Sequence, residues 1–130
     1  MDFNEAIQKH AQWKFKFRNA VLLKEPVDVM AISKDNNCEV GKWLHGEARA
    51  LHGHCKAHAK CLADHAAFHL AAGKVADAVN GGNKDAVERL MAAGSAFAEA
   101  SKKVGVSLIE LQNEIASKSQ RKAAAACSAI

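Results

Sequence analysis

The segment Asp64-His65-Ala-Ala-Phe68-His69 lies at the centre of a stretch whose spacing is helical. The positions that share one stripe repeat at alternating steps of three and four: Leu62, His65, His69, Ala72, Ala76 and Val79. This spacing predicts a helix from about His54 or His58 to Asn80, with both histidines pointing inward. Because residues four apart lie one above the other on a helix face, His65 and His69 can direct two imidazoles at one point.

Two further residues complete a possible metal site with this pair. They are His10 in His10-Ala-Gln-Trp13, and Cys38 in Cys38-Glu-Val-Gly41-Lys-Trp43. A tetrahedral zinc ion takes four donors at about 2.0 to 2.3 Å, drawn from His nitrogen and Cys sulfur. We therefore predict one Zn²⁺ per chain and assign no catalytic residue. The predicted metal ligands are His10, Cys38, His65 and His69.

Composition limits the classes of protein to which the chain can belong. Its 130 residues carry a net charge of +4 and are 49% hydrophobic, which fits one domain with a single core. No basic face alternates with aromatic residues, so nucleic-acid binding is not expected. No signal peptide and no apolar run of about 20 residues is found, which predicts a cytoplasmic chain without membrane contact. In that reducing compartment, the four cysteines indicate metal binding, redox sensing or packing rather than disulfides.

The N-terminal part of the sequence is expected to form a long helix, a short helical turn and a short helix. Residues 3–24 form the first, with His10 on its buried face, and Pro26 ends it. A short turn is expected at 29–32, and another helix from Cys38 to about His45. At the start of that helix the macrodipole favours a thiolate. Gly41 is expected to allow a close backbone approach.

Histidine and cysteine crowd the stretch from His52 to Cys61, which raises the possibility of a second metal site. Gly53 interrupts the local order, and no Cys-x-x-Cys pair with a metal-binding spacing is found. Solvent-facing histidines at the start of a helix are the preferred interpretation, although adventitious metal binding stays open.

The C-terminal part predicts one long helix from Asp85 to about Lys118, because apolar residues follow a heptad pattern after the turn Asn80-Gly-Gly-Asn83. Such a helix is about 50 Å long. Its excess length predicts packing on a second copy of the chain, hence a homodimer. Residues 121–130 are expected to form a flexible tail, with Cys127 a poor ligand candidate, and residues 1–120 the domain.

Taken in order and spacing, the four ligand segments resemble the chemoreceptor zinc-binding (CZB) domain family. The resemblance rests on His10 three residues before Trp13, Cys38 three before Gly41, and the His65–His69 pair 27 residues after Cys38. It implies an all-α fold, a four-helix bundle with a short extra helix and a long C-terminal helix, that coordinates zinc through three histidines and one cysteine.

The resemblance also implies a regulatory rather than enzymatic role. Domains of this family are joined to chemoreceptors or diguanylate cyclases whose output they control, and the family's cysteine is implicated in sensing oxidants such as hypochlorous acid. Cys38 would be that redox switch, and a signalling partner or fused output domain would read it. Three alternatives are weighed beside this one: a catalytic zinc, a hemerythrin-like metal- or oxygen-binding bundle, and a purely structural zinc-stapled bundle.

Overall fold

The computed structural model describes the backbone of residues 1–128 and the side chains of residues 1–121. Over the described residues it contains eight helices and no strand. The helices are α1 (Phe3–Ala11), α2 (Trp13–Leu23), α3 (Val29–Ser33), α4 (Glu39–His45), α5 (Glu47–His52), α6 (Lys56–Asn80), α7 (Lys84–Met91) and α8 (Ala96–Ser128). The predicted all-α class with a long C-terminal helix is confirmed.

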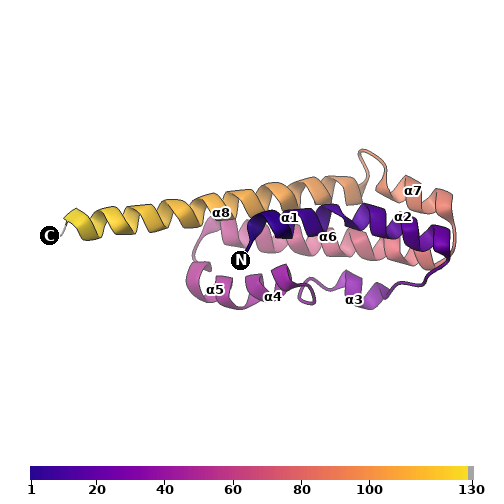
Figure 1. Ribbon diagram of the computed structural model, residues 1–130, viewed down its shortest axis with the longest axis horizontal. Coiled ribbons are helices and arrows are strands. Elements are labelled where there is room, and N and C mark those ends of the chain that lie inside the picture. Colours follow the sequence, from indigo (N-terminus) through magenta and orange to yellow (C-terminus); the bar gives the residue numbers. More distant parts are fainter. Residues whose placement is uncertain (129–130) are drawn as a thin grey trace.

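Helix α6 is the central element of the fold. It contacts α2, α3, α4, α5, α7 and α8. Figure 1 shows α8 and the consecutive helices α1 and α2 along one side of α6, and the short helices α3, α4 and α5 along the other. The core lies between these layers, where the largest fully buried side chains include Phe17, Phe68, Leu44, Leu108 and Leu111. The α6 side chains that face this core are therefore held from several directions.

The prediction of a single first helix over 3–24 is wrong in one detail, because it is interrupted at Gln12. Helix α1 ends at Ala11 and α2 begins at Trp13, and Gln12 keeps right-handed helical angles (φ −76°, ψ −13°) between them. The two helices continue in nearly one direction (Figure 1). Neither Pro nor Gly marks the position, so the helical spacing of the apolar residues conceals the break.

The end of α2 is set by two features of the chain. Lys24 adopts left-handed angles (φ 56°), and the next backbone N–H, that of Glu25, donates to the Ala20 carbonyl at 2.9 Å. Pro26 follows, where the sequence predicts the stop. The connector is then tied to α6, because the Asn80 side chain accepts from the Val27 N–H and donates to the Val27 carbonyl, both at 2.8 Å.

The predicted helix from Asp85 to Lys118 is also wrong, because it is divided into α7 and α8. The chain turns over residues 92–95, where Gly94 takes a positive φ of 84° that favours glycine. Ser95 then caps α8, since its hydroxyl accepts from the Ala98 N–H at 3.1 Å. The apolar pattern continues across this turn, so periodicity alone could not reveal it.

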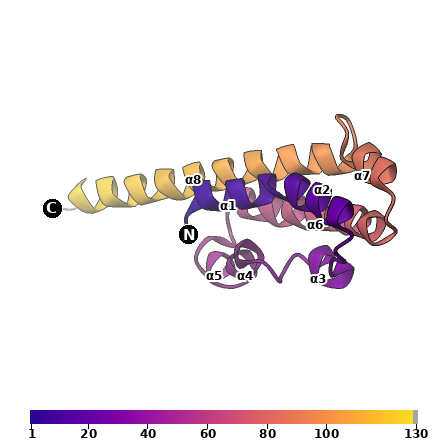
Figure 2. The same ribbon diagram turned by 45° about the vertical axis from the view of Figure 1, so that its right-hand side comes forward.

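Helix α8 extends beyond the other helices toward its C-terminus, as Figures 1 and 2 show. Its 33 residues correspond to about 50 Å. The backbone is helical through Ser128, over most of the stretch for which a flexible tail is expected. The expectation for the Cys127 side chain lies outside the described residues.

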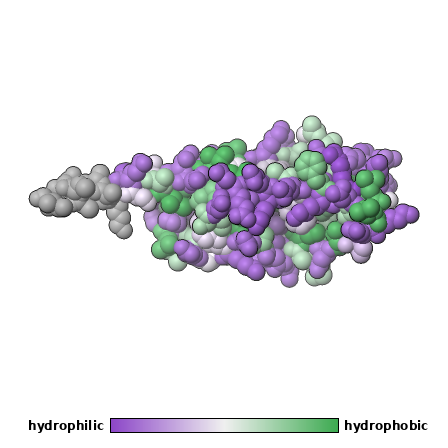
Figure 3. Space-filling view, in the orientation of Figure 1, coloured by the Kyte–Doolittle hydropathy of each residue, from purple (hydrophilic) through white to green (hydrophobic). Residues whose placement is uncertain are grey.

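None of the helices described is both long enough and apolar enough to cross a bilayer. On the face seen in Figure 3 hydrophilic residues predominate, and the hydrophobic patches between them are small.

Candidate metal centre

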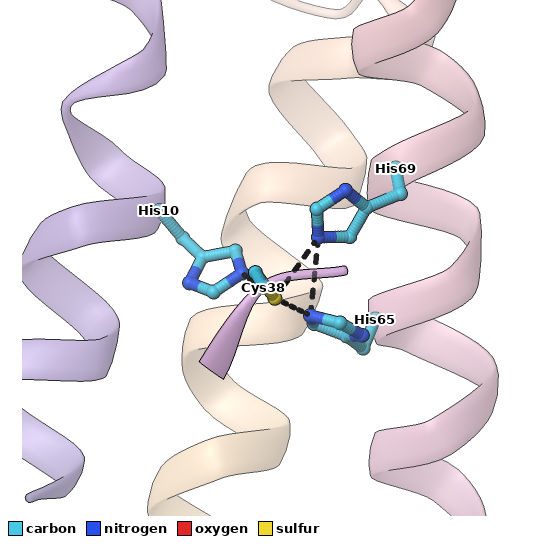
Figure 4. A group of neighbouring side chains, drawn as sticks. All are labelled: His10, Cys38, His65 and His69. Atoms are coloured by element: carbon cyan, nitrogen blue, oxygen red, sulfur yellow. Dashed lines mark hydrogen bonds between the residues drawn. The ribbon is translucent and has the colours of Figure 1, made fainter. Parts of the chain in front are cut away.

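Three separate elements bring the four predicted ligands together. His10 lies near the end of α1, Cys38 directly precedes α4, and both His65 and His69 lie on α6. One donor atom from each residue lies within 4.8 Å of every other. Figure 4 shows the three imidazoles turned toward the Cys38 sulfur. The three histidines are buried and Cys38 is half-buried.

The spacing of the Cys38, His65 and His69 donor atoms is close to that around a tetrahedral ion, and the His10 donor lies farther away. The Cys38 Sγ lies 3.2 Å from the His65 Nε2, 3.6 Å from the His69 Nε2 and 4.0 Å from the His10 Nε2. The two α6 Nε2 atoms lie 3.2 Å apart. Zinc–nitrogen bonds of about 2.0 Å and zinc–sulfur bonds of about 2.3 Å in a tetrahedron require about 3.3 Å between nitrogens and about 3.5 Å between nitrogen and sulfur.

Backbone carbonyls orient two of the imidazoles. The His10 Nδ1 donates to the Ala6 carbonyl and the His69 Nδ1 to the Ile32 carbonyl, each at 2.8 Å. Because a carbonyl oxygen can only accept, the proton of each neutral ring is on Nδ1, and the Nε2 lone pairs face the centre. Lone pairs that converge in a buried space repel one another unless a cation lies between them. The donor chemistry therefore fits a metal ion.

His65 differs from the other two imidazoles. Its Nδ1 is buried and finds no hydrogen-bond partner among the residues that the structure describes. Its Nε2 is the nearest nitrogen to the Cys38 sulfur, so this ring is held from its Nε2 side alone.

Cys38 is positioned by the turn that precedes α4. Its sulfur accepts from the Gly41 N–H at 3.3 Å, so the side chain caps the helix. Gly41 lies against the Asp35 carbonyl, and a Cβ at this position would overlap that oxygen. The predicted close backbone approach at Gly41 is confirmed.

Burial dominates the protonation of the cluster. It lowers the pKa values of His10 and His69, and lowers the pKa of His65 to about 3. All three rings are therefore neutral near pH 7, as metal ligation requires. For Cys38, burial raises the pKa of the thiol, although hydrogen bonds from the Gly41 and Val40 N–H groups oppose it. The N–H groups at the helix start therefore favour the thiolate, as expected, but desolvation outweighs them and the net pKa of Cys38 is raised.

The crowded stretch from His52 to Cys61 forms no second cluster in the part of the chain that the structure describes. His58 donates from its Nε2 to the Leu44 carbonyl at 2.9 Å, and the Cys55 sulfur lies 3.0 Å from the Lys118 Nζ. Cys61 lies in the core, where burial raises its pKa to about 12. His54 is exposed. The preferred interpretation of solvent-facing histidines therefore holds for His54 and is wrong for His58, which is buried.

The two tryptophans, each a few residues from a donor, pack against phenylalanines of α1 and α2. The Trp43 ring lies edge-on to Phe3 at 5.4 Å, and the Trp13 ring lies 5.2 Å from Phe17. Asp64 faces away from the cluster, because it accepts a hydrogen bond from Ser107 on α8.

Three contributors to the site were missed by the sequence interpretation. They are the carbonyls of Ala6 and Ile32 and the contact of α3 with Gly73, which has no room for a Cβ beside Ser33. The carbonyls carry no residue-type signal. The glycine inside a helical pattern could have indicated a close contact.

A model of the chemoreceptor zinc-binding domain matches residues 10–76, just over half of the chain. This chain belongs to the chemoreceptor zinc-binding domain family. The matched segment contains all four converging donors. No curated protein and no solved structure matches the chain significantly. The zinc-binding family therefore agrees with the buried cluster of three histidines and one cysteine.

Proposed function

We propose that this chain is a regulatory zinc-binding domain that holds one Zn²⁺ between His10, Cys38, His65 and His69. The observation that carries the proposal is the convergence of four oriented donors from three elements in one buried place. Bound zinc would be a cation coordinated from α1, from the start of α4 and from α6, so that it would cross-link these three elements. Because the unfolded chain has no such preformed site, zinc binding also stabilises the folded arrangement.

The proposed regulation follows from this cross-link. On this proposal the consecutive helices α1 and α2, the helices α3 to α5, α6, and the pair α7 and α8 act together as a four-helix bundle. Loss of zinc loosens α1 and the Cys38 turn relative to α6, and a signalling partner such as a chemoreceptor or diguanylate cyclase reads the change. The projecting part of α8 supports a homodimer. Light scattering is then expected to give twice the 13.9 kDa mass of one chain.

Cys38 gives the proposed domain a second input. Hypochlorous acid would oxidise the Cys38 thiolate by two electrons. The sulfur becomes a sulfenic acid, and the chlorine of the oxidant leaves as chloride. The oxidised sulfur is a poorer ligand than a thiolate. Oxidation would therefore act in the same direction as zinc loss. The half-buried position of Cys38 supports access by a small oxidant.

The rival functions have less support. A catalytic zinc keeps an open position for water, whereas four protein donors fill a tetrahedron. A hemerythrin-like centre needs carboxylate ligands beside histidines, and no carboxylate belongs to the described donor cluster. We propose a non-enzymatic role in a cytoplasmic setting. A purely structural zinc is the outcome if zinc binds but helix packing and partner output do not respond to it.

The experiment is metal analysis of purified wild type, Cys38→Ala and His69→Ala, with His54→Ala as control because His54 is an exposed histidine outside the cluster. We expect about one zinc per wild-type and control chain. Each ligand variant should lose most of its bound zinc. Equal zinc content in all four proteins would refute the assignment.

A further inference from the structure

A cavity of about 500 Å³ opens beside two of the four donors. It lies between α1, the start of α2 and the residues that lead into α4, and its lining includes His10, Cys38, Gln12, Trp13 and Glu39. Neither His65 nor His69 lines this cavity, and both are buried. The cluster is therefore approached from the side of His10 and Cys38.

Charged side chains at this cavity connect the elements that carry the two donors. Lys9 precedes His10 and Glu39 follows Cys38, and the Lys9 Nζ lies 3.6 Å from the Glu39 Oε2. The same Nζ lies 3.0 Å from the Glu5 Oε1. The ion pair between Lys9 and Glu39 therefore joins α1 to α4 one residue away from each donor.

The two sides of this ion pair remain largely exposed. The Lys9 side chain is 52% exposed and that of Glu39 is 85% exposed. Surface pairs of this kind contribute little to stability and are screened by salt. Such a contact can close and open without disturbing the core.

We propose that this cavity is the port through which small metal chelators reach the bound ion, and that the Lys9–Glu39 pair restrains its opening. This inference rests on the proposed zinc binding. A volume of about 500 Å³ is within the range of small-molecule sites in proteins. The port therefore admits compact chelators and excludes folded proteins. Zinc would leave the site by transfer to a small molecule that enters beside Cys38 and His10.

The test measures the rate of zinc transfer from the zinc-loaded chain to 4-(2-pyridylazo)resorcinol, which changes colour on binding zinc. Gln12→Trp places a large side chain at the lining, because Gln12 is exposed there and makes no side-chain capping bond. Gln112→Trp on α8 is its control, since Gln112 is also exposed and does not line the cavity. We expect Gln12→Trp to slow transfer at least threefold and the control to match wild type.

A second pair of variants tests the restraint in the opposite direction. Glu39→Gln removes the pair with Lys9, and Glu99→Gln removes a comparable exposed pair with Lys102 on α8. We expect Glu39→Gln to speed transfer about two- to fivefold at low salt, with the difference vanishing at high salt. Glu99→Gln should leave the rate unchanged. Because these two substitutions act at exposed side chains, they keep the test valid if Gln12→Trp folds poorly.

Equilibrium zinc content separates the two proposals. One zinc per chain with wild-type transfer rates in both Gln12→Trp and Glu39→Gln would overturn the port and leave the metal centre standing. Zinc content that does not depend on Cys38 or His69 would overturn the metal centre and the port together. Slower transfer in Gln12→Trp, or faster transfer in Glu39→Gln, with silent controls and unchanged zinc content, supports the port.

Discussion

The position of the Cys38 sulfur depends on a residue that has no side chain. Gly41 donates its N–H to that sulfur, and its Cα lies against the Asp35 carbonyl so closely that a Cβ would overlap the oxygen. Any other residue has to push the turn that precedes α4 away from the cluster.

Gly41→Ala is therefore expected to displace Cys38. Overpacking of this kind costs about 1–3 kcal/mol in unfolding free energy, and we expect zinc affinity to fall at least tenfold, as for residues that orient metal ligands. The control is Gly105→Ala, because nothing lies within 4 Å of a Cβ there. It should keep zinc affinity and gain about 0.5–1 kcal/mol of helix stability. Competition with a zinc indicator and denaturant titration measure both quantities.

Burial of the imidazoles sets the pH dependence of the metal-free protein. The pKa of His65 is about 3 in the folded state and about 6.5 in an unfolded chain. Between these values the unfolded state binds more protons, so stability rises with pH and is complete above about 6.5. It is lost as pH falls.

Urea unfolding in the presence of a chelator should therefore show a loss of about 2 kcal/mol for His65 alone between pH 7 and pH 5. The lowered pKa values of His10 and His69 act in the same direction. His65→Gln should flatten the dependence. Unfolding free energies that are equal at the two pH values would contradict the assigned burial.

Helix α3 orients the His69 imidazole of α6 and packs closely against the same helix. Its Ile32 carbonyl accepts from the His69 Nδ1, and Ser33 packs on Gly73 of α6. A Cβ at Gly73 would overlap the Ser33 side chain. The placement of α3 and the orientation of His69 are therefore coupled.

Gly73→Ala should move α3 outward and release the His69 ring, which lowers zinc affinity without touching a ligand. Adding Ser33→Gly should recover part of that affinity, since the overlap is mainly with the Ser33 side chain. Calorimetric zinc titration of the single and double variants measures the recovery. Additive losses in the double variant would show that the two residues are not coupled.

The elements also show which features of the fold could be predicted from the sequence. The helical spacing of Leu62 to Val79 and the turn Asn80-Gly-Gly-Asn83 correctly predict α6 and its end. The breaks at Gln12 and at residues 92–95 were missed, because apolar periodicity continues through both. Gly94 signals the second break by residue type. It lies on the apolar stripe between Leu90 and Phe97, however, so the heptad pattern continues through it.

The candidate site was more predictable than the breaks. Two histidines four apart on a buried helix face point to one place whatever the exact helix ends are. Donor type suggests His10 and Cys38 as the remaining ligands, and the resemblance of their segments to a known family favours them over the other histidines and cysteines. The carbonyls that orient His10 and His69 could not be predicted, since every residue carries one and only the packing selects among them.

Across the whole molecule, the cross-link between layers predicts where zinc removal is felt. Chelation should speed amide hydrogen exchange in α1, which contains His10, and in α4, which Cys38 directly precedes. Helix α7 supplies no donor and is the internal control. Equally faster hydrogen exchange in all helices, or unchanged exchange in α1, would contradict a local coupling between zinc and the helices α1 and α4.

Zinc-edge X-ray absorption on the loaded protein tests coordination by three histidines and Cys38 most directly. We expect zinc to be bound by three nitrogen donors at about 2.0 Å and one sulfur at about 2.3 Å, with the sulfur lost in Cys38→Ser. A shell without sulfur, or with more than one sulfur, would contradict it.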